Sequence, residues 1–252
     1  MKTQTIHDDW PEPIEVLNES GGSDIVLICE HASNHIPAEY KNLGLDDADL
    51  SRHIAWDIGA AAVTRALAAK LDAPAFLGTY SRLLIDLNRP LGVPTSIPER
   101  SESTDIPGNA SLSGAEKKRR GDLIFAPFHN FVAEHLRTRE TVGRKSRIVA
   151  IHSFTPVFFG KERPWHAGVL YDSSRAFGEA VISGLRQDSI LNVEPNVPYV
   201  ISRDHDYAVL VHGHDRGYPG ILIEVRQDLL TSAEGTEGWA RRIAQALNFP
   251  WK

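Results

Sequence analysis

The sequence predicts a single α/β domain built on a mostly parallel, mixed β-sheet with helices on both faces. Short apolar runs typical of buried strands alternate with longer segments whose apolar residues recur at helical spacing. Four of the apolar runs end in His, Arg, Asn or Glu, within residues 25–34, 80–90, 147–156 and 221–228. Ligands bind at strand ends in open α/β sheets, so we expect one active site where these ends meet.

The composition limits the class of protein. The 252 residues, 42% hydrophobic and 24% charged, are enough for one large domain with a full core. A net charge of −6 offers no basic field, so we expect neither nucleic acid nor a membrane as a partner. The single cysteine, Cys29, suits a reducing compartment, and the first residues lack the apolar core of a signal peptide. These features predict a cytoplasmic protein; they do not indicate its oligomeric state.

The elements follow from apolar spacing and from Pro and Gly. Residues 1–22 are polar and predict a surface arm ahead of a domain over residues 23–252. Strands are predicted at residues 25–30, 75–77, 83–87, 148–151, 169–171 and 221–225, with extended backbone at Val193 and over 197–201. Helices are predicted at residues 54–71, 114–139, 176–185 and 239–247; Pro127 should kink or divide the second of these. Residues 90–113 contain four prolines and predict a long loop, a frequent place for a functional lid.

Two histidines directly follow predicted strands. His31 comes after residues 25–30, and His152 comes after residues 148–151. Taken alone, His31 suits a capping or hydrogen-bonded role better than a ligand role. Two imidazoles at strand ends are the arrangement that zinc requires, with one position left open for water. We therefore interpret His31 and His152 as zinc ligands.

A catalytic zinc usually takes a third protein ligand, for which Glu30, Asn34 and Asp57 are candidates. Asp57 is predicted in the first turns of the helix over residues 54–71, among apolar side chains. A buried carboxylate there needs a cation, a metal or several donors, and His53 is an alternative partner. Glu30 also suits a salt-bridged position at a strand end, and Asn is a poor zinc ligand.

Glu224 interrupts the apolar run ILIEV in a predicted central strand. An ionised glutamate without a partner is unfavourable there. One interpretation is a buried pair with Arg226, because residues two apart on a strand point to the same face. The other is a general base beside a metal-activated water.

Arg82, Asn88 and Arg89 lie within one segment, YSRLLIDLNRP. The guanidinium fork matches a carboxylate, and it can also polarise a carbonyl oxygen on which negative charge develops. A surface salt bridge is the alternative for either arginine taken singly. His166, in the string RPWH, is a candidate for lining the substrate pocket.

Five strings together resemble the N-formylglutamate amidohydrolase family. They are CEHASNHIP, HIAWDIGA, YSRLLIDLNRP, IHSFTPVFFG with RPWHAGVLYD, and PGILIEVRQDLL. They occur in family order and extend from about residue 25 to residue 230, most of the chain. The resemblance implies a catalytic domain with a phosphorylase/hydrolase-like fold, as in zinc carboxypeptidases, aspartoacylases and zinc amidases.

The resemblance also implies roles for individual residues. His152 with its following serine resembles the second zinc histidine, and Glu224-Val225-Arg226 is similar to the Glu-x-Arg around the catalytic glutamate of the carboxypeptidases. Arg82 with the string DLNR resembles the aspartoacylase segment in which one arginine polarises the scissile carbonyl and Asn-Arg, here Asn88 and Arg89, binds the substrate carboxylate. On this basis Glu224 and Arg82 are the expected catalytic residues. The expected substrate-binding residues are Asn88, Arg89, His166 and Arg226.

The chain departs from its wider relatives at one point. Carboxypeptidases and aspartoacylases use His-x-x-Glu for two zinc ligands, and here the sequence is His31-Ala-Ser-Asn34. Zinc amidases take their carboxylate ligand from the start of the following helix, where Asp57 falls. The resemblance therefore implies one zinc ion held by His31, Asp57 and His152, with Glu30 in reserve.

The implied reaction is hydrolysis of a small N-acyl amino acid, N-formyl-L-glutamate to formate and L-glutamate. Two alternatives remain open at this point. One is a zinc carboxypeptidase or a cell-wall amidase. The other is a metal-free binding or structural domain on the same scaffold, and the Asn34 departure is what keeps this alternative open.

Overall fold

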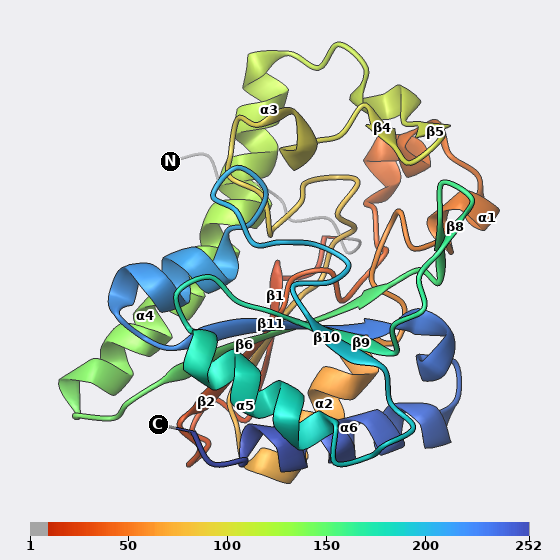
Figure 1. Cartoon of the computed structure of the whole chain (residues 1–252). Helices are drawn as coiled ribbons and strands as arrows, with labels where there is room; N and C mark the ends of the chain where they lie inside the picture. Colours follow the sequence, from red (N-terminus) through yellow and green to blue (C-terminus); the bar gives the residue numbers. More distant parts are fainter. Residues whose placement is uncertain (1–9, 252) are drawn as a thin grey trace.

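A seven-stranded sheet runs through the middle of the protein in the computed structural model, which describes residues 10–251 (Figure 1). Its strands stand in the order β1-β3-β2-β6-β11-β9-β10. The pairs β3–β2, β2–β6, β6–β11 and β9–β10 are parallel, whereas β1–β3 and β11–β9 are antiparallel. The strands are β1 (Ile14–Leu17), β2 (Ile25–Cys29), β3 (Ala75–Gly78), β6 (Arg147–Phe154), β9 (Ala167–Leu170), β10 (Val193–Pro195) and β11 (Gly220–Arg226). The predicted mostly parallel, mixed sheet is confirmed.

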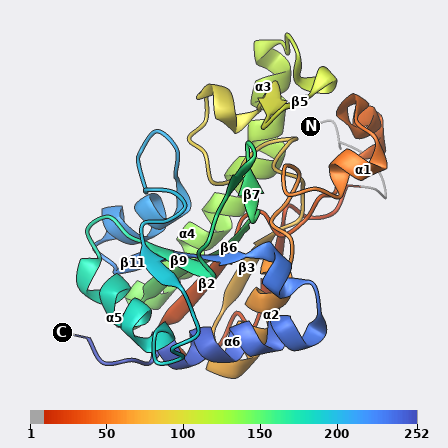
Figure 2. The ribbon, with the colours of Figure 1, turned by 45° about the vertical axis from the view of Figure 1, so that its right-hand side comes forward.

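Helices cover both faces of the sheet, as predicted. Helices α2 (Ala60–Leu71), α5 (Arg175–Leu185) and α6 (Ala233–Leu247) gather on one side, and Figure 2 shows the same arrangement after rotation. Strand β2 is apolar on both faces, so both faces need to be covered. Its Leu27 packs with these three helices, and the next residue, Ile28, packs on the opposite side. Helix α4 (Ala126–Thr141) lies on that opposite side, and the π-helix η5 (Val209–Gly213) packs there against β6 and β11.

A π turn divides the helix predicted at residues 114–139. Helix α3 (Gly114–Arg120) continues into the π turn η4 (Gly121–Phe125) and then into α4. Pro127 falls in the first two positions of α4. Proline lacks an N–H and its ring clashes with the carbonyl four residues earlier in a regular helix, so the wider turn accommodates it. The predicted division at Pro127 is confirmed.

The helix predicted at residues 54–71 begins later, at Ala60. Residues 54–59 form turns, and Gly59 has φ +83, a left-handed conformation that a right-handed helix excludes. Asp57 therefore lies in the turn before α2 and not in its first turns, which corrects the expectation. The Asp57 N–H donates to the carbonyl of His31 at 3.0 Å, and this bond joins the turn to the end of β2.

Two predicted extended segments are not strands. Residues 83–87 form turns, although Leu83, Leu84, Ile85 and Leu87 are buried in the apolar cluster beneath α4. Residues 197–201 form no strand either. Residues 83–87 show that an irregular backbone can bury apolar side chains as a strand does, and an apolar run alone does not distinguish the two. In residues 197–201, Ile201 is buried but Tyr199 and Val200 are exposed.

Part of the expected N-terminal arm belongs to the sheet, because β1 forms its edge beside β3. Residues 1–9 of that arm lie outside the described residues. The long loop expected at residues 90–113 contains only short elements, which are η2 (Pro94–Ser96), β4 (Arg100–Ser101), β5 (Thr104–Asp105) and η3 (Pro107–Asn109). The other short elements are η1 (Ala38–Gly44), α1 (Asp47–Leu50), β7 (Val157–Phe158), β8 (Lys161–Glu162), η6 (His214–Arg216) and η7 (Gln227–Leu230).

Three adjacent parallel strands bring the candidate residues together. In β6 and β11, His152 and Glu224 are register partners, and Glu30 follows the last residue of the neighbouring β2. Strand β6 continues to Phe154, so His152 lies inside it and does not follow it as expected. Because side chains two apart share a face, Glu30, His152 and Glu224 project from the same face of the sheet as Ile28, Ala150 and Leu222.

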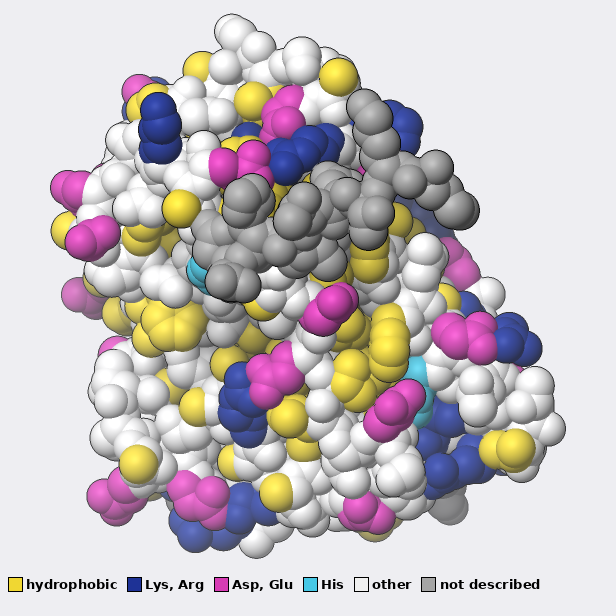
Figure 3. Space-filling model, turned by 180° about the vertical axis from the view of Figure 1, so that it is seen from behind, with side chains coloured by type: hydrophobic (Ala, Val, Ile, Leu, Met, Phe, Trp, Pro, Cys, Tyr) yellow, Lys and Arg dark blue, Asp and Glu magenta, His cyan; other side chains and the backbone are white. Residues whose placement is uncertain are grey.

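The surface carries both signs of charge. Lys and Arg side chains are interspersed with Asp and Glu on the face shown in Figure 3. Over the described residues, every helix is too short or too polar to cross a bilayer.

Candidate active site

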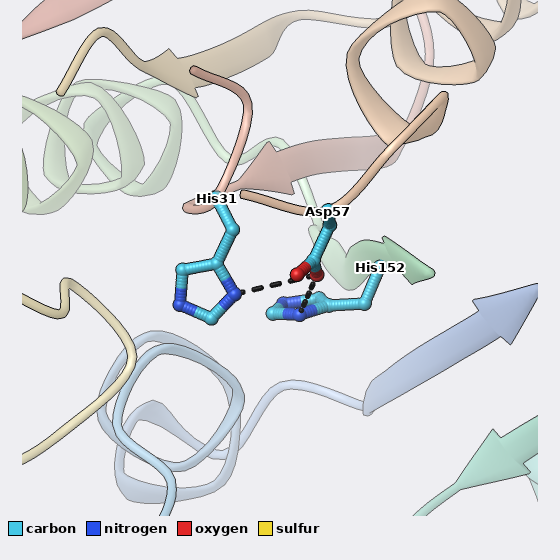
Figure 4. Close-up of side chains that lie close together, drawn as sticks. All are labelled: His31, Asp57 and His152. Atoms are coloured by element: carbon cyan, nitrogen blue, oxygen red, sulfur yellow. Dashed lines mark hydrogen bonds and ion pairs between the residues drawn. The ribbon is translucent and has the colours of Figure 1, made fainter. Parts of the chain in front are cut away.

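Three buried side chains converge where β2, β6 and the turn before α2 meet (Figure 4). Asp57 Oδ2 lies 3.3 Å from His31 Nδ1 and 2.9 Å from His152 Nδ1. One ligand atom from each residue can be chosen so that all three lie within 4.8 Å of one another. The sequence analysis proposed these same three residues as metal ligands.

The outer nitrogen of each imidazole meets a second carboxylate. His31 donates from Nε2 to Asp86 Oδ1 at 2.7 Å, and His152 donates from Nε2 to Glu30 Oε2 at 3.0 Å. Carboxylates accept hydrogen bonds only, so these contacts place a proton on each Nε2. Carboxylates that fix the tautomer of histidines in this way are typical of the second layer of a metal site.

The inner nitrogens then require a cation. With a proton on Nε2, the Nδ1 of a neutral imidazole is an acceptor, and it faces the Asp57 carboxylate, which is also an acceptor. Such groups repel unless a proton or a metal ion lies between them. Two imidazole nitrogens and one carboxylate oxygen are a known donor set for catalytic zinc. Ligands of a tetrahedral zinc lie about 3.3 Å apart, close to the two distances from Asp57. The residues present therefore fit a zinc ion.

Charge complementarity also holds these groups in place. Burial alone raises the pKa of Asp57, but His31 and His152 outweigh it and hold that pKa well below its usual range. Burial alone lowers the pKa of His152, but Glu30 and Asp57 together raise it well above its usual range. The site thus concentrates negative charge around the position that a cation would take.

Glu30 is not part of the inner group. Its carboxylate contacts the outer nitrogen of His152, opposite the nitrogen that faces Asp57. This position suits a residue that orients His152, so the geometry favours Asp57 over Glu30 as the third ligand.

Arg82 joins the inner and outer carboxylates. Its Nη1 lies 3.3 Å from Asp57 Oδ1, and its Nη2 lies 2.7 Å from Asp86 Oδ2. The Arg82 side chain remains 23% exposed and lines a pocket of about 440 Å³ above the three converging residues. A guanidinium held in this way is oriented before a substrate arrives.

Glu224 faces the same pocket. It is buried, and its Oε2 has no hydrogen-bond partner among the described residues. Burial is the main cause that raises the pKa of Glu224 to about 7, with His152 opposing the rise and Asp57 adding to it. The pairing with Arg226 does not form, since Arg226 binds Asp228 at 2.8 Å. An unpartnered carboxylate in a pocket is a candidate proton acceptor.

Asn88 and Arg89 both line the pocket, but in different ways. The amide oxygen of Asn88 accepts from the N–H groups of Tyr207 and Ala208 at 2.9 and 3.1 Å, and its Nδ2 donates to Asp206. Its polar atoms thus tie one wall of the pocket together. The Arg89 guanidinium donates to the carbonyl of Asn88 at 3.0 Å.

The helix layer holds the segment that carries Asp86 and Asn88. Arg120 in α3 donates from Nη1 to the carbonyl of Leu84 at 3.0 Å. His129 in α4 donates from Nε2 to the carbonyl of Leu87 at 2.8 Å. These buried side-chain hydrogen bonds take the place of the backbone hydrogen bonds that a neighbouring strand would have supplied to the segment.

Two expected residues do not line the pocket, and His53, which does, has a different partner from the one considered. His166 and Arg226 do not line it within residues 10–251, and His166 Nδ1 accepts instead from the N–H of Asn192 at 2.8 Å. His53, considered as the partner of Asp57, lies 3.4 Å from Glu102.

Several residues of the site were not predicted from the sequence. Asp86 is a buried carboxylate within LLIDL, the same signal that identified Asp57. Asp206 and Tyr199 line the pocket from a segment without periodic apolar spacing, so no sequence signal marked them.

Comparison with known proteins decides the family. Residues 23–231 match the profile of the N-formylglutamate amidohydrolase family. The chain belongs to this family. It is accordingly an amidohydrolase, as the resemblance implied.

Two solved structures resemble this family member over nearly its whole length. The gene product Atu2144 from Agrobacterium tumefaciens is 35% identical, with a TM-score of 0.93, and the match covers 97% of this chain and 96% of that one. N-formylglutamate amidohydrolase from Ralstonia eutropha JMP134 is 16% identical, with a TM-score of 0.63, over 94% and 96% of the two chains, and shows the shared fold. No protein with a curated description matches the sequence significantly.

Replacing Asn88 with Ala should destabilise the protein. The change leaves the buried N–H of Ala208 and the N–H of Tyr207 without their acceptor, and an unpaired buried donor costs about 1–3 kcal/mol. Urea unfolding should show a loss of that size. Asn248→Ala is the control, because its side chain bonds at an exposed helix end and its loss should cost less than about 0.5 kcal/mol. Equal stability of the two variants would contradict the role assigned to Asn88.

Proposed function

We propose that this chain is a zinc-dependent hydrolase of small N-acyl amino acids, with N-formyl-L-glutamate as the substrate that its family and the name of the Ralstonia relative favour. The observation that carries the proposal is the convergence of His31, Asp57 and His152. The Nδ1 atom of each histidine faces the Asp57 carboxylate, and these acceptor atoms repel one another unless a proton or a metal ion lies between them. The products would be formate and L-glutamate.

His31, Asp57 and His152 would hold the zinc ion, while Asp86 and Glu30 orient the two imidazoles. When bound, zinc supplies Lewis acidity, which polarises the acyl carbonyl and brings the ionisation of water to about pH 7. The remaining chemistry belongs to the side chains around it.

Glu224 is the proposed general base. Its unpartnered Oε2 accepts a proton from the attacking water and then returns that proton to the nitrogen of the departing amine. This carboxylate is buried beside the pocket, and no salt bridge occupies it among residues 10–251. It is therefore free to take part in the proton transfer.

The two arginines of the 82–89 segment have separate proposed roles. Arg82, fixed by Asp57 and Asp86, stabilises the negative charge that develops on the acyl oxygen. Arg89 binds the substrate α-carboxylate through its planar fork. Asn88 supports this wall through its contacts to residues 206–208.

The metal assignment is tested by removing either histidine. His31→Ala and His152→Ala should each lose stoichiometric zinc, measured by elemental analysis of purified protein, because each deletes one of three donors. His214→Ala is the matched control, since His214 lies at the surface beside Ser173 and should keep its full zinc content. Full zinc in both site variants would reject the site.

Glu224→Gln should keep zinc and the fold but lose about 10²–10⁴-fold in kcat, with little change in KM. Glutamine preserves the volume of the side chain and removes its ability to accept a proton. Steady-state kinetics together with zinc analysis provides the measurement. A kcat near that of the wild type would exclude Glu224 as the base.

Arg89→Lys should raise KM for N-acyl amino acids that carry a free α-carboxylate, because lysine cannot form the bidentate contact. Substrates whose α-carboxylate is amidated, already poor, should scarcely change. Arg82→Lys is the comparison and should lower kcat instead, because its partner is the charge of the transition state. Equal losses on free-acid and amidated substrates would show that Arg89 does not bind the carboxylate.

A further inference from the structure

Tyr199 stands at the rim of the pocket on a segment that β9 holds in place. The Asn196 N–H donates to the carbonyl of Val169 at 3.0 Å, and the Asn196 side chain accepts from the N–H of Tyr171 at 3.0 Å. The backbone then passes so close to Gly168 that a Cβ there would lie 1.7 Å from the carbonyl oxygen of Val197. Gly168 is the register partner of Glu224, so this path brings the segment over the strand that neighbours the proposed base.

The hydroxyl of Tyr199 is oriented by a buried arginine. Arg163, only 9% exposed, donates from Nη2 to Tyr199 Oη at 3.1 Å. Its guanidinium also stacks over the rings of Phe158 and Tyr199, at 4.5 and 5.0 Å from their centroids. These contacts fix both partners in one geometry.

The phenol keeps its own proton free. Arginine has no acceptor, so it can only donate in this contact. Within residues 10–251, no acceptor is found for the Tyr199 O–H, and the side chain is 45% exposed where it lines the pocket. A hydroxyl whose oxygen accepts from a cation, and whose proton has no acceptor, can donate that proton to a ligand.

Tyr199 lines the same pocket as Glu224 and Arg82. After burial, the carboxylate of Glu224 is the main cause that raises the pKa of Tyr199, and Arg163 and Arg82 oppose this rise. The phenol therefore shares one pocket with the proposed base and with the arginine proposed to stabilise the acyl oxygen. In the proposed function Glu224 and Arg82 both act on the amide that is cleaved, so that amide would lie in the pocket that Tyr199 lines.

We propose that Tyr199 Oη donates a hydrogen bond to the acyl oxygen of the scissile amide, and that Arg163 is the positioning residue for this hydroxyl. The inference rests on the proposed function. It adds a second protein donor, besides Arg82, for the oxygen on which charge develops. Donation from Arg163 polarises the phenol, which strengthens the bond that its proton makes.

Tyr199→Phe tests the donor. The change removes only the hydroxyl, and loss of one donor to a developing oxyanion typically lowers kcat by about 10²-fold. We expect a loss of that order in the hydrolysis of N-acyl amino acids, with KM changed less than about threefold, because the bond strengthens in the transition state. Tyr218→Phe is the matched control, since its hydroxyl donates to Glu140 outside the pocket, and it should retain wild-type kcat.

Three results would overturn the donor role. They are an unchanged kcat in Tyr199→Phe, a change confined to KM, and an equal loss in Tyr218→Phe. Zinc content and thermal unfolding of each variant confirm that the comparison is between folded, loaded enzymes. A wild-type protein that hydrolyses no N-formyl, N-acetyl or N-succinyl amino acid would reject the proposed function, and this inference with it. An active wild-type protein together with an unchanged kcat in Tyr199→Phe would reject this inference and leave the proposed function standing.

A double-mutant cycle tests Arg163. Arg163→Lys retains the charge but not the planar fork, so it should lower kcat about tenfold when Tyr199 is present. In the Tyr199→Phe background the same change should have little effect, because the hydroxyl that it positions is gone. Equal losses in both backgrounds would assign Arg163 to packing against Phe158 and would overturn its positioning role.

Discussion

The buried carboxylate of Asp57 is the group on which the rest of the site depends. A carboxylate removed from water costs several kcal/mol unless charged or hydrogen-bonding partners surround it. Asp57 finds those partners in three separate parts of the chain, His31 after β2, Arg82 in the loop after β3 and His152 in β6. Its N–H also bonds to the carbonyl of His31. The network that assembles the proposed metal site therefore also joins three separate parts of the fold.

The sequence predicted the centre of this arrangement well because burial leaves a clear signal there. Strands β2, β6 and β11 are covered on both faces, so they read as continuous apolar runs, and a His or Glu that interrupts or ends such a run stands out. His31, His152 and Glu224 were found in this way, and the structure brings all three to one pocket. The mixed sheet with helices on both faces follows from the same alternation of strand and helix.

The remainder was not predictable from apolar spacing, because spacing reports burial and not backbone conformation. Residues 83–87 are as apolar as a strand, yet their carbonyls are bound by Arg120 and His129 from the helix layer. The helix at Ala60 begins late because Gly59 adopts a left-handed conformation that an Ala-rich composition does not reveal. Tyr199 reaches the pocket only because Gly168 lets a distant segment approach, a tertiary contact without a local pattern.

The π turn η4 sets the rotational phase between the two helices that hold the 84–87 segment. His129 follows Arg120 by nine residues, and in a regular α-helix nine residues make about two and a half turns, which would place the two side chains on opposite sides. The wider turn absorbs one residue, so the rotation is closer to that of eight residues, and both side chains face the same loop. Deleting one residue from Gly121–Phe125 would give a regular helix that keeps this phase, whereas a regular helix of the present length would turn α4 by about 100° relative to α3. The wider turn is thus what lets a segment of this length hold both carbonyls beneath the active site, and a helix that stayed regular over the same residues would release one of them.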